Sequence, residues 1–114
     1  AGADALVVST HGGRQLDGAV ATAARLPAIV AAVGDRTTVL VDGGVRSGVD
    51  VFRALALGAR GVMIGRPWVF ALAAAGERGL ATLLAHWRRE LATTMALAGV
   101  TRINAIGAQH LDHD

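Results

Sequence analysis

Three short apolar runs, each followed by a segment that contains glycine, set the hydrophobic pattern of the chain. They occupy residues 5–9 (ALVVS), 38–41 (TVLV) and 61–64 (GVMI). Continuous apolar runs of this length between turn residues are typical of strands buried on both faces of a parallel sheet. The pattern therefore predicts three strands, each ending in a polar loop.

The segments between and after these runs carry helical patterns. Residues 19–33 are rich in alanine and are expected to be mostly helical. An interruption is expected near Pro27, because proline is favoured in the first turn of a helix and not in its interior. Residues 68–75 predict a short apolar helix that breaks around Gly76 and Gly79.

A longer helix is expected from there to about residue 98. Its apolar positions fall three or four residues apart and predict one buried stripe, made of Leu80, Leu83, Leu84, Trp87, Leu91 and Met95. The other faces hold charged residues, Arg78, Arg88, Arg89 and Glu90. This arrangement favours a helix packed on a sheet over a membrane helix or a partner helix. The longest clean apolar run, residues 67–75, is also far shorter than the ~20 residues of a membrane span.

The C-terminal segment predicts little structure. One short turn is expected around residues 102–106, followed by a frayed end. A cluster of His and Asp at that end resembles a metal site, but a solvated terminus is the better interpretation of His110, Asp112, His113 and Asp114.

Strands that alternate with helices predict a parallel α/β fold. A doubly wound sheet and a (β/α)8 barrel both satisfy the pattern. Barrels place a phosphate site on the loops after strands seven and eight, and here two successive glycine loops with an arginine follow the second and third runs. We therefore expect residues 1–114 to be the C-terminal third of one barrel domain, about strands six to eight. A complete barrel needs about 250 residues, so the front of the domain would be missing.

The loop after residues 38–41 is the main candidate for anion binding. Gly43 and Gly44 have no Cβ, so main-chain N–H groups can approach a ligand closely. Arg46 adds a fork of charged donors, and the helix expected at residues 49–57 adds unpaired N-terminal N–H groups and the positive end of its dipole. A tight turn with a solvated arginine explains this stretch, taken alone, equally well.

The ends of that helix are marked clearly. Ser47 is placed to cap its first turn, with Asp50 three residues on, and Gly58 provides a stop after its last residue.

The loop after the first run holds the best candidates for catalysis. His11 can act as a base near neutral pH, and Arg14 offers a planar fork that binds a carboxylate in bidentate fashion. Gly12 and Gly13 keep the loop open to a substrate. A surface histidine beside a solvated arginine explains the loop alone equally well. Catalysis is favoured because parallel strands bring this loop and both glycine loops to the same edge of the sheet.

Three motifs stand in order along the chain: VVSTHGGRQLD at residues 7–17, DGGVRSGVDVFRALALGA at 42–59 and VMIGRP at 62–67. Together they resemble the C-terminal segments of the FMN-dependent family that oxidises 2-hydroxy acids. This family includes glycolate oxidase, lactate oxidase, lactate monooxygenase and mandelate dehydrogenase. The resemblance covers nearly the whole chain.

The resemblance implies a (β/α)8 barrel with FMN at its C-terminal mouth and oxidation of an (S)-2-hydroxy acid to a 2-oxo acid. It implies that His11 is the proton-abstracting base, in contact with the substrate, and that Arg14 anchors the substrate carboxylate. It places Ser9 near the flavin, and it places around the ribityl phosphate Asp42, Gly43, Gly44, Val45, Arg46, Gly65 and Arg66. It implies no metal. The parent protein is expected to be a cytoplasmic homo-oligomer, and the isolated chain is expected to be inactive.

Two departures limit what this chain can do. Thr10 stands where the family usually has Asn, which alters local hydrogen bonding. The family's active-site tyrosines, its flavin-facing lysine, the carboxylate that orients the histidine and a second substrate arginine come from upstream, and the chain contains no Tyr and no Lys. The residues present therefore account for only part of an active site.

Two alternatives stay open. An oxidoreductase like IMP dehydrogenase also carries a DGGIR-like phosphate loop, but that class needs a cysteine nucleophile and this chain has no Cys. The chain could also be a non-catalytic half-barrel.

Composition excludes other classes. All 11 basic residues are Arg, so a net charge of +2 is enough to raise the pI to about 11.0 without a basic patch for nucleic acid. The absence of Cys excludes disulfides and thiolate metal sites and fits a cytoplasmic protein. With 53% hydrophobic residues, one unit with a substantial core is expected.

Overall fold

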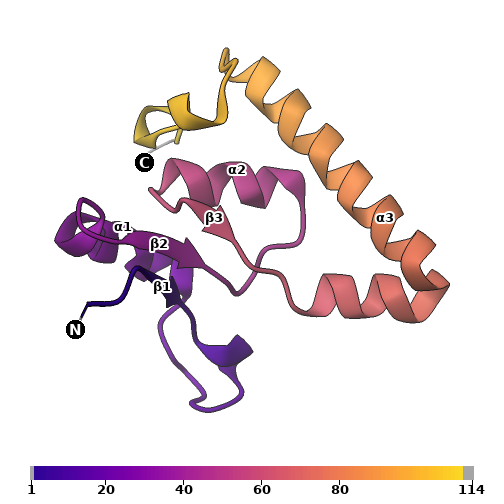
Figure 1. The fold of residues 1–114 in the computed structure, drawn as a ribbon, viewed down its shortest axis with the longest axis horizontal. Helices are drawn as coiled ribbons and strands as arrows, with labels where there is room; N and C mark the ends of the chain where they lie inside the picture. Colours follow the sequence, from indigo (N-terminus) through magenta and orange to yellow (C-terminus); the bar gives the residue numbers. More distant parts are fainter. Residues whose placement is uncertain (1, 112–114) are drawn as a thin grey trace.

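A parallel sheet of three strands forms the centre of the computed structural model, which describes residues 2–111. The strands β1 (Ala5–Val8), β2 (Thr38–Val41) and β3 (Gly61–Val62) lie side by side in chain order. Figure 1 shows them beside the helices that connect them. The predicted strands and their parallel order are confirmed, although the first and third end sooner than expected, since the chain turns there into the loops that follow.

Only one face of this sheet is covered. On that face Val8, Val39 and Val41 are buried, and they contact side chains of the connecting helices. On the opposite face Val7 is 41% exposed. Because successive residues of a strand point to opposite faces, the expected burial on both faces is not reached within the described residues.

The helix α1 (Thr22–Val33) connects β1 to β2 and continues through Pro27, so the interruption predicted there is wrong. Proline lacks the N–H of the helical hydrogen bond, but Leu26 beside it has no exposed surface and anchors the helix in the core. That core is a cluster of Val8, Leu26, Val39, Val41, Ala54 and Ala59.

The helix α2 (Gly48–Ala56) connects β2 to β3 and begins as predicted. Its cap is Ser47, whose Oγ accepts a hydrogen bond of 3.1 Å from the Asp50 N–H. Beyond its C-terminal end Gly58 has a φ of +100°, and a Cβ there would lie 2.8 Å from Cγ1 of Val30. Both predicted boundary signals are therefore confirmed.

The helix α3 (Arg66–Leu97) bends where Ala75 and Gly76 leave helical backbone angles, as the predicted break requires. Gly79 lies inside the second part, and a Cβ there would overlap the backbone carbonyl of Ala71. Figure 1 shows the two parts at a steep angle to each other, with the second part beside α2.

The second part of α3 packs mainly against α2, not against the sheet. Trp87 is buried and most of the predicted stripe is half-buried, but Leu84 remains 49% exposed. By length and composition alone α3 could cross a membrane. However, the bend divides it, and the second part carries five charged residues, Glu77, Arg78, Arg88, Arg89 and Glu90. Neither part is a continuous apolar span of ~20 residues.

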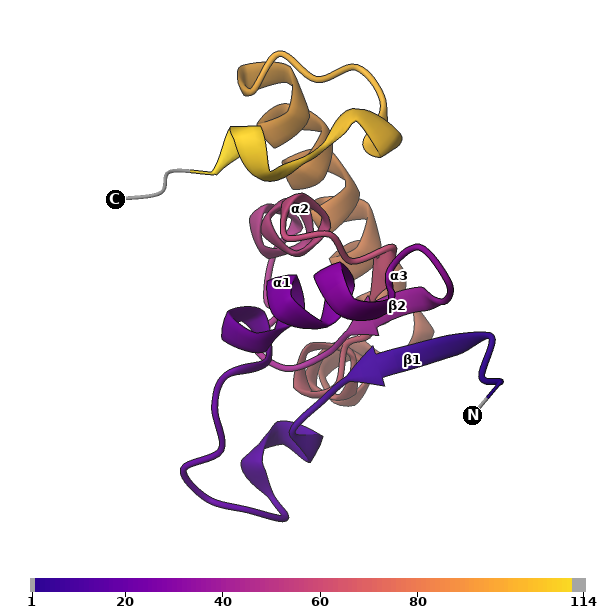
Figure 2. The same cartoon turned by 90° about the vertical axis from the view of Figure 1, so that its left-hand side faces the viewer.

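The C-terminal segment folds back over α2, as Figures 1 and 2 show. It contains two short 3-10 helices, η2 (Ile103–Ala105) and η3 (Ala108–His110). Ile106 is buried, and the His110 ring meets Phe52 of α2 edge-on at 6.0 Å. The prediction of a frayed end is wrong as far as the structure describes the chain. Three members of the predicted terminal cluster lie outside the described residues, Asp112, His113 and Asp114.

Candidate cofactor and substrate site

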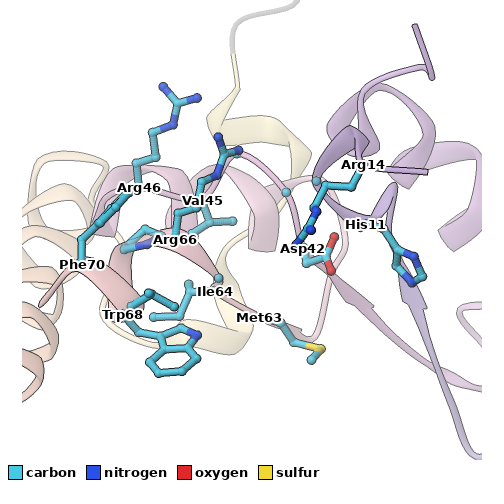
Figure 3. A pocket seen from close by; sticks show the side chains of 16 residues that line it. His11, Arg14, Asp42, Val45, Arg46, Met63, Ile64, Arg66, Trp68 and Phe70 are labelled. Atoms are coloured by element: carbon cyan, nitrogen blue, oxygen red, sulfur yellow. The ribbon is translucent and has the colours of Figure 1, made fainter. Parts of the chain in front are cut away.

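One cavity of about 800 Å³ lies at the carboxyl ends of the three strands. Its walls come from the loops after the strands and from the first turn of α3. Nine of the ten predicted site residues line it: His11, Arg14, Asp42, Gly43, Gly44, Val45, Arg46, Gly65 and Arg66. Figure 3 shows His11, Arg14 and Asp42 on one side and Arg46 and Arg66 on the other.

The loop after β1 forms a short 3-10 helix, η1 (His11–Gly13), in an unusual backbone conformation. His11, Gly12 and Gly13 have φ angles of 52°, 66° and 75°. Gly12 and Gly13 adopt positive φ angles without steric cost because they have no Cβ. His11 is the one non-glycine residue with positive φ among the described residues. The side chains of His11 and Arg14 are exposed, and neither has a hydrogen-bond or ion-pair partner within residues 2–111. Both are free to meet a ligand.

Asp42 is held in place from two directions. The Ser9 hydroxyl donates a hydrogen bond of 2.8 Å to its Oδ2, and the Thr22 hydroxyl donates one of 2.6 Å to its backbone carbonyl. Thr22, at the start of α1, is only 6% exposed. Ser9, the tenth predicted residue, does not line the cavity but supports Asp42, which does. Thr22 was not predicted, because a threonine before an alanine-rich helix carries no signal of a partner 20 residues away.

The other carboxylate oxygen of Asp42 is unsatisfied. Oδ1 is buried and has no hydrogen-bond partner in the part of the chain that the structure describes. Buried carboxylate oxygens normally accept hydrogen bonds, so this one is an acceptor open to a donor from outside the described residues. A hydroxyl group would suit this position.

The glycine loops leave room for an anion. Neither Gly44 nor Gly65 has any atom within 4 Å of the place where a Cβ would stand. No hydrogen bond within the described residues uses the backbone N–H groups of Gly44, Gly65 or Arg66. The cavity walls carry three guanidinium groups and one carboxylate, and none of these arginines has an ion-pair partner in residues 2–111. This excess of donors and positive charge favours a phosphate.

One expectation about this anion site is met only in part. The N-terminal N–H groups of α2 were expected to be free, but Gly48 donates to Oε2 of Glu90 at 2.8 Å and Asp50 donates to Ser47. The Arg46 N–H donates to Oδ2 of Asp50 at 3.0 Å. Protein groups therefore satisfy two N–H groups of the first turn of α2, which leaves the loops and the arginines as the main groups for an anion.

The cavity also has an apolar wall that was not predicted to belong to the site. It includes Met63, Trp68 and Phe70, which are 49%, 39% and 67% exposed. Val45 lines the cavity but is itself 8% exposed, so its side chain packs into the protein. For Trp68 and Phe70 the signal was present in the apolar run after Gly65, which we interpreted only as helix.

Comparison with known proteins agrees with this geometry. The sequence pattern of the family described as FMN-dependent dehydrogenase matches residues 1–113. An L-lactate dehydrogenase of Caulobacter vibrioides is 61% identical over 105 residues, which are 92% of this chain and 27% of that protein. An L-lactate dehydrogenase of Pseudomonas syringae is 56% identical over 110 residues, 96% of this chain and 29% of that protein.

Solved structures give the same result. The structure of mandelate oxidase with benzoyl-formic acid superposes with a TM-score of 0.89 at 53% identity, covering 92% of this chain and 31% of that one. A mandelate oxidase variant with (S)-mandelic acid gives a TM-score of 0.90 at 53% identity, with the same coverage. The chain thus spans between a quarter and a third of the length of these relatives. The match along nearly its whole length is decisive: the chain belongs to the FMN-dependent dehydrogenase family.

Proposed function

We propose that this chain supplies the phosphate-binding loops, the general base and the carboxylate anchor of an enzyme that oxidises an (S)-2-hydroxy acid to a 2-oxo acid with FMN. One observation carries the proposal: a single cavity brings His11 and Arg14 together with Asp42 and the two glycine–arginine loops. The similarity to L-lactate dehydrogenases and to mandelate oxidase supports the class of substrate.

The residues of the cavity fit FMN. The unsatisfied Oδ1 of Asp42 matches a hydroxyl of a ribityl chain, which can donate a hydrogen bond. The open cradle at Gly44 and Gly65 and the guanidinium groups of Arg46 and Arg66 match its phosphate. The exposed apolar wall offers a surface for a flat ring system.

The position of this chain in the fold is part of the proposal. We place β1, β2 and β3 as strands six to eight of a (β/α)8 barrel, with residues 1–114 as the C-terminal part of that domain. The open face of the sheet supports this placement, since Val7 would point into the barrel core once the other strands were present. The partial coverage of the relatives supports it as well.

The mechanism assigns one task to each side chain. The Arg14 guanidinium binds the substrate carboxylate through two parallel hydrogen bonds and so sets the orientation of the hydroxyl-bearing carbon. The imidazole of His11 takes a proton from the substrate and holds it as the 2-oxo acid forms. FMN, when bound, supplies the acceptor for two electrons. The upstream part of the domain would add the remaining groups of the site.

Two preparations test the proposal. The first is the 114-residue chain alone, and the second is a hybrid in which it replaces the matching segment of the Caulobacter vibrioides relative. We expect the hybrid to take up FMN, and its flavin absorbance at about 450 nm to bleach when L-lactate, glycolate or mandelate is added without oxygen. The chain alone is expected to do little of either. A folded hybrid that binds FMN but is not bleached by any of these acids would refute the assignments of His11 and Arg14.

A further inference from the structure

We propose that Glu90 of α3 is a positioning residue for the phosphate loop, residues 42–46, and that it acts through the Gly48 N–H at the start of α2. The proposal rests on the proposed function, because it assigns a support to the same phosphate site. Glu90 does not line the cavity and lies 42 positions from Gly48 in the sequence.

The contact that carries the proposal is a charge-assisted hydrogen bond between two helices. The Gly48 N–H donates to Oε2 of Glu90 at 2.8 Å. The second oxygen, Oε1, lies 3.3 Å from Nε2 of His86, one turn earlier on α3. The Glu90 side chain is 31% exposed, so the carboxylate is partly withdrawn from solvent. The hydrogen bond from Gly48 therefore orients the carboxylate, and the His86 ring lies beside its second oxygen.

The helices meet too closely at this point for Gly48 to be replaced. A Cβ on Gly48 would overlap the Trp87 carbonyl and the backbone nitrogen of Leu91, and would lie 2.7 Å from Cβ of Glu90. Trp87 is 7% exposed. The hydrogen bond between Gly48 and Glu90 thus lies where the backbones of α2 and α3 are closely packed. Such packing leaves the two helices little room to shift if the carboxylate is removed.

This contact is connected directly to the phosphate loop. Arg46 is two residues before Gly48, and its backbone N–H is held by Oδ2 of Asp50 in the first turn of α2. A movement of that turn therefore moves the backbone of Arg46, and with it the loop of Gly43 and Gly44. At the other end of the loop Thr22 holds the Asp42 carbonyl. The loop is fixed to α1 at one end and, through Glu90, to α3 at the other.

The test compares FMN with riboflavin, which lacks the phosphate. Dissociation constants of both are measured for the hybrid by flavin fluorescence, with the variants Glu90→Ala and Glu90→Gln. Glu77→Ala is the matched control, since it removes an exposed carboxylate from the same helix. We expect Glu90→Ala to weaken FMN binding about tenfold and to leave riboflavin binding unchanged, because only the phosphate contacts depend on the loop. Glu90→Gln keeps an oxygen acceptor for Gly48 and is expected to restore most of the affinity for FMN.

Several results would overturn the role of Glu90. An equal loss of FMN and riboflavin affinity in Glu90→Ala would indicate a general loss of fold, and no loss of either would show that the contact is irrelevant to the loop. A Gln variant as weak as the Ala variant would overturn the hydrogen-bond account. A hybrid without substitutions that binds FMN no tighter than riboflavin would instead refute the proposed function. In that case the contact is tested in the 114-residue chain alone by the hydrogen-exchange rate of the Gly48 amide. If Glu90→Ala leaves that rate unchanged, the hydrogen bond between Gly48 and Glu90 is overturned.

Discussion

The Ser9 hydroxyl donates a hydrogen bond of 2.8 Å to Oδ2 of Asp42, 33 positions later in the sequence. The same hydroxyl oxygen accepts the backbone N–H of His11 at 3.0 Å. Ser9 therefore joins the ends of β1 and β2, and it links the loop that presents His11 to the carboxylate that faces the proposed cofactor. The loops proposed for catalysis and for cofactor binding are thus connected by one side chain.

Replacing Ser9 by alanine should weaken cofactor binding moderately. Oδ2 of Asp42 would lose its donor while Oδ1 already lacks one, so the carboxylate would be free to turn away from the ligand. We expect Ser9→Ala to raise the Kd of the hybrid for FMN about three- to tenfold, the range of one lost hydrogen bond. Fluorescence titration measures it. Thr82→Ala is the control, because its hydroxyl bonds only the Arg78 carbonyl on α3. Unchanged affinity in Ser9→Ala would contradict the linking role.

The sequence allowed the site to be located because the information is local and repeated. Each strand is a continuous apolar run, each is followed by its own loop, and parallel strands bring such loops to one edge. The cap of α2 could also be predicted, since Ser47 and Asp50 stand only three residues apart. These features depend on neighbours in sequence.

The features that were missed depend on contacts between distant segments. Glu90 was placed outside the buried stripe of its helix, yet it reaches Gly48 because the bend at Ala75 and Gly76 turns α3 back onto α2. The helix through Pro27 is stabilised by the burial of Leu26, which local propensity does not include. No pattern in the sequence specifies how far a helix will bend or what it will then meet.

Gly65 should matter more for the cofactor than for the fold. No atom lies within 4 Å of the point that a Cβ would occupy, so an alanine side chain clashes with nothing in the described residues. The backbone angles of φ −110° and ψ −95° lie outside the main regions for residues with a Cβ, so alanine costs some local strain there. The added methyl group would, however, fill the cradle proposed for the phosphate. We expect Gly65→Ala to weaken FMN binding at least about tenfold with riboflavin binding unchanged, as measured by fluorescence titration.

The matched variant is Gly48→Ala, which should lower the stability of the fold more than Gly65→Ala does. Its Cβ would overlap backbone atoms of α3, and overpacking of this kind typically costs about 1–3 kcal/mol of unfolding free energy. Urea unfolding followed by circular dichroism measures the loss in both variants. If Gly65→Ala were as destabilising as Gly48→Ala, the glycine would be structural and the cradle would not be supported.

His11 should be required for turnover and not for flavin binding. Its exposed imidazole has no partner within the described residues and contributes little to the fold. We expect His11→Ala in the hybrid to lower kcat by ~10²–10⁴-fold, the usual contribution of a general base, with FMN content unchanged. Anaerobic stopped-flow reduction by L-lactate measures the step directly. Near-normal reduction in a variant that retains FMN would eliminate His11 as the base.

Arg14 should determine the use of the substrate carboxylate. Lysine preserves the charge but replaces a planar fork with a single ammonium group, so two parallel hydrogen bonds cannot form. We expect Arg14→Lys to raise the KM for L-lactate about tenfold or more, with the Kd for FMN unchanged. Arg25→Lys on the exposed surface of α1 is the control. Identical steady-state constants for Arg14→Lys and the unsubstituted hybrid would argue against the anchor.

Leu26 provides the test of whether this chain forms its core without the rest of a barrel. The side chain has no exposed surface and lies between α1 and the covered face of the sheet, so truncation should leave a cavity. We expect Leu26→Ala to lower the unfolding free energy of the 114-residue chain by about 2–5 kcal/mol. Leu97→Ala, at a side chain that is 86% exposed, should change it by less than about 0.5 kcal/mol. Equal urea midpoints for the two variants would mean that the covered face of the sheet is not packed in the isolated chain. The other strands of the proposed barrel would then be needed to fold the core as well as to complete the proposed site.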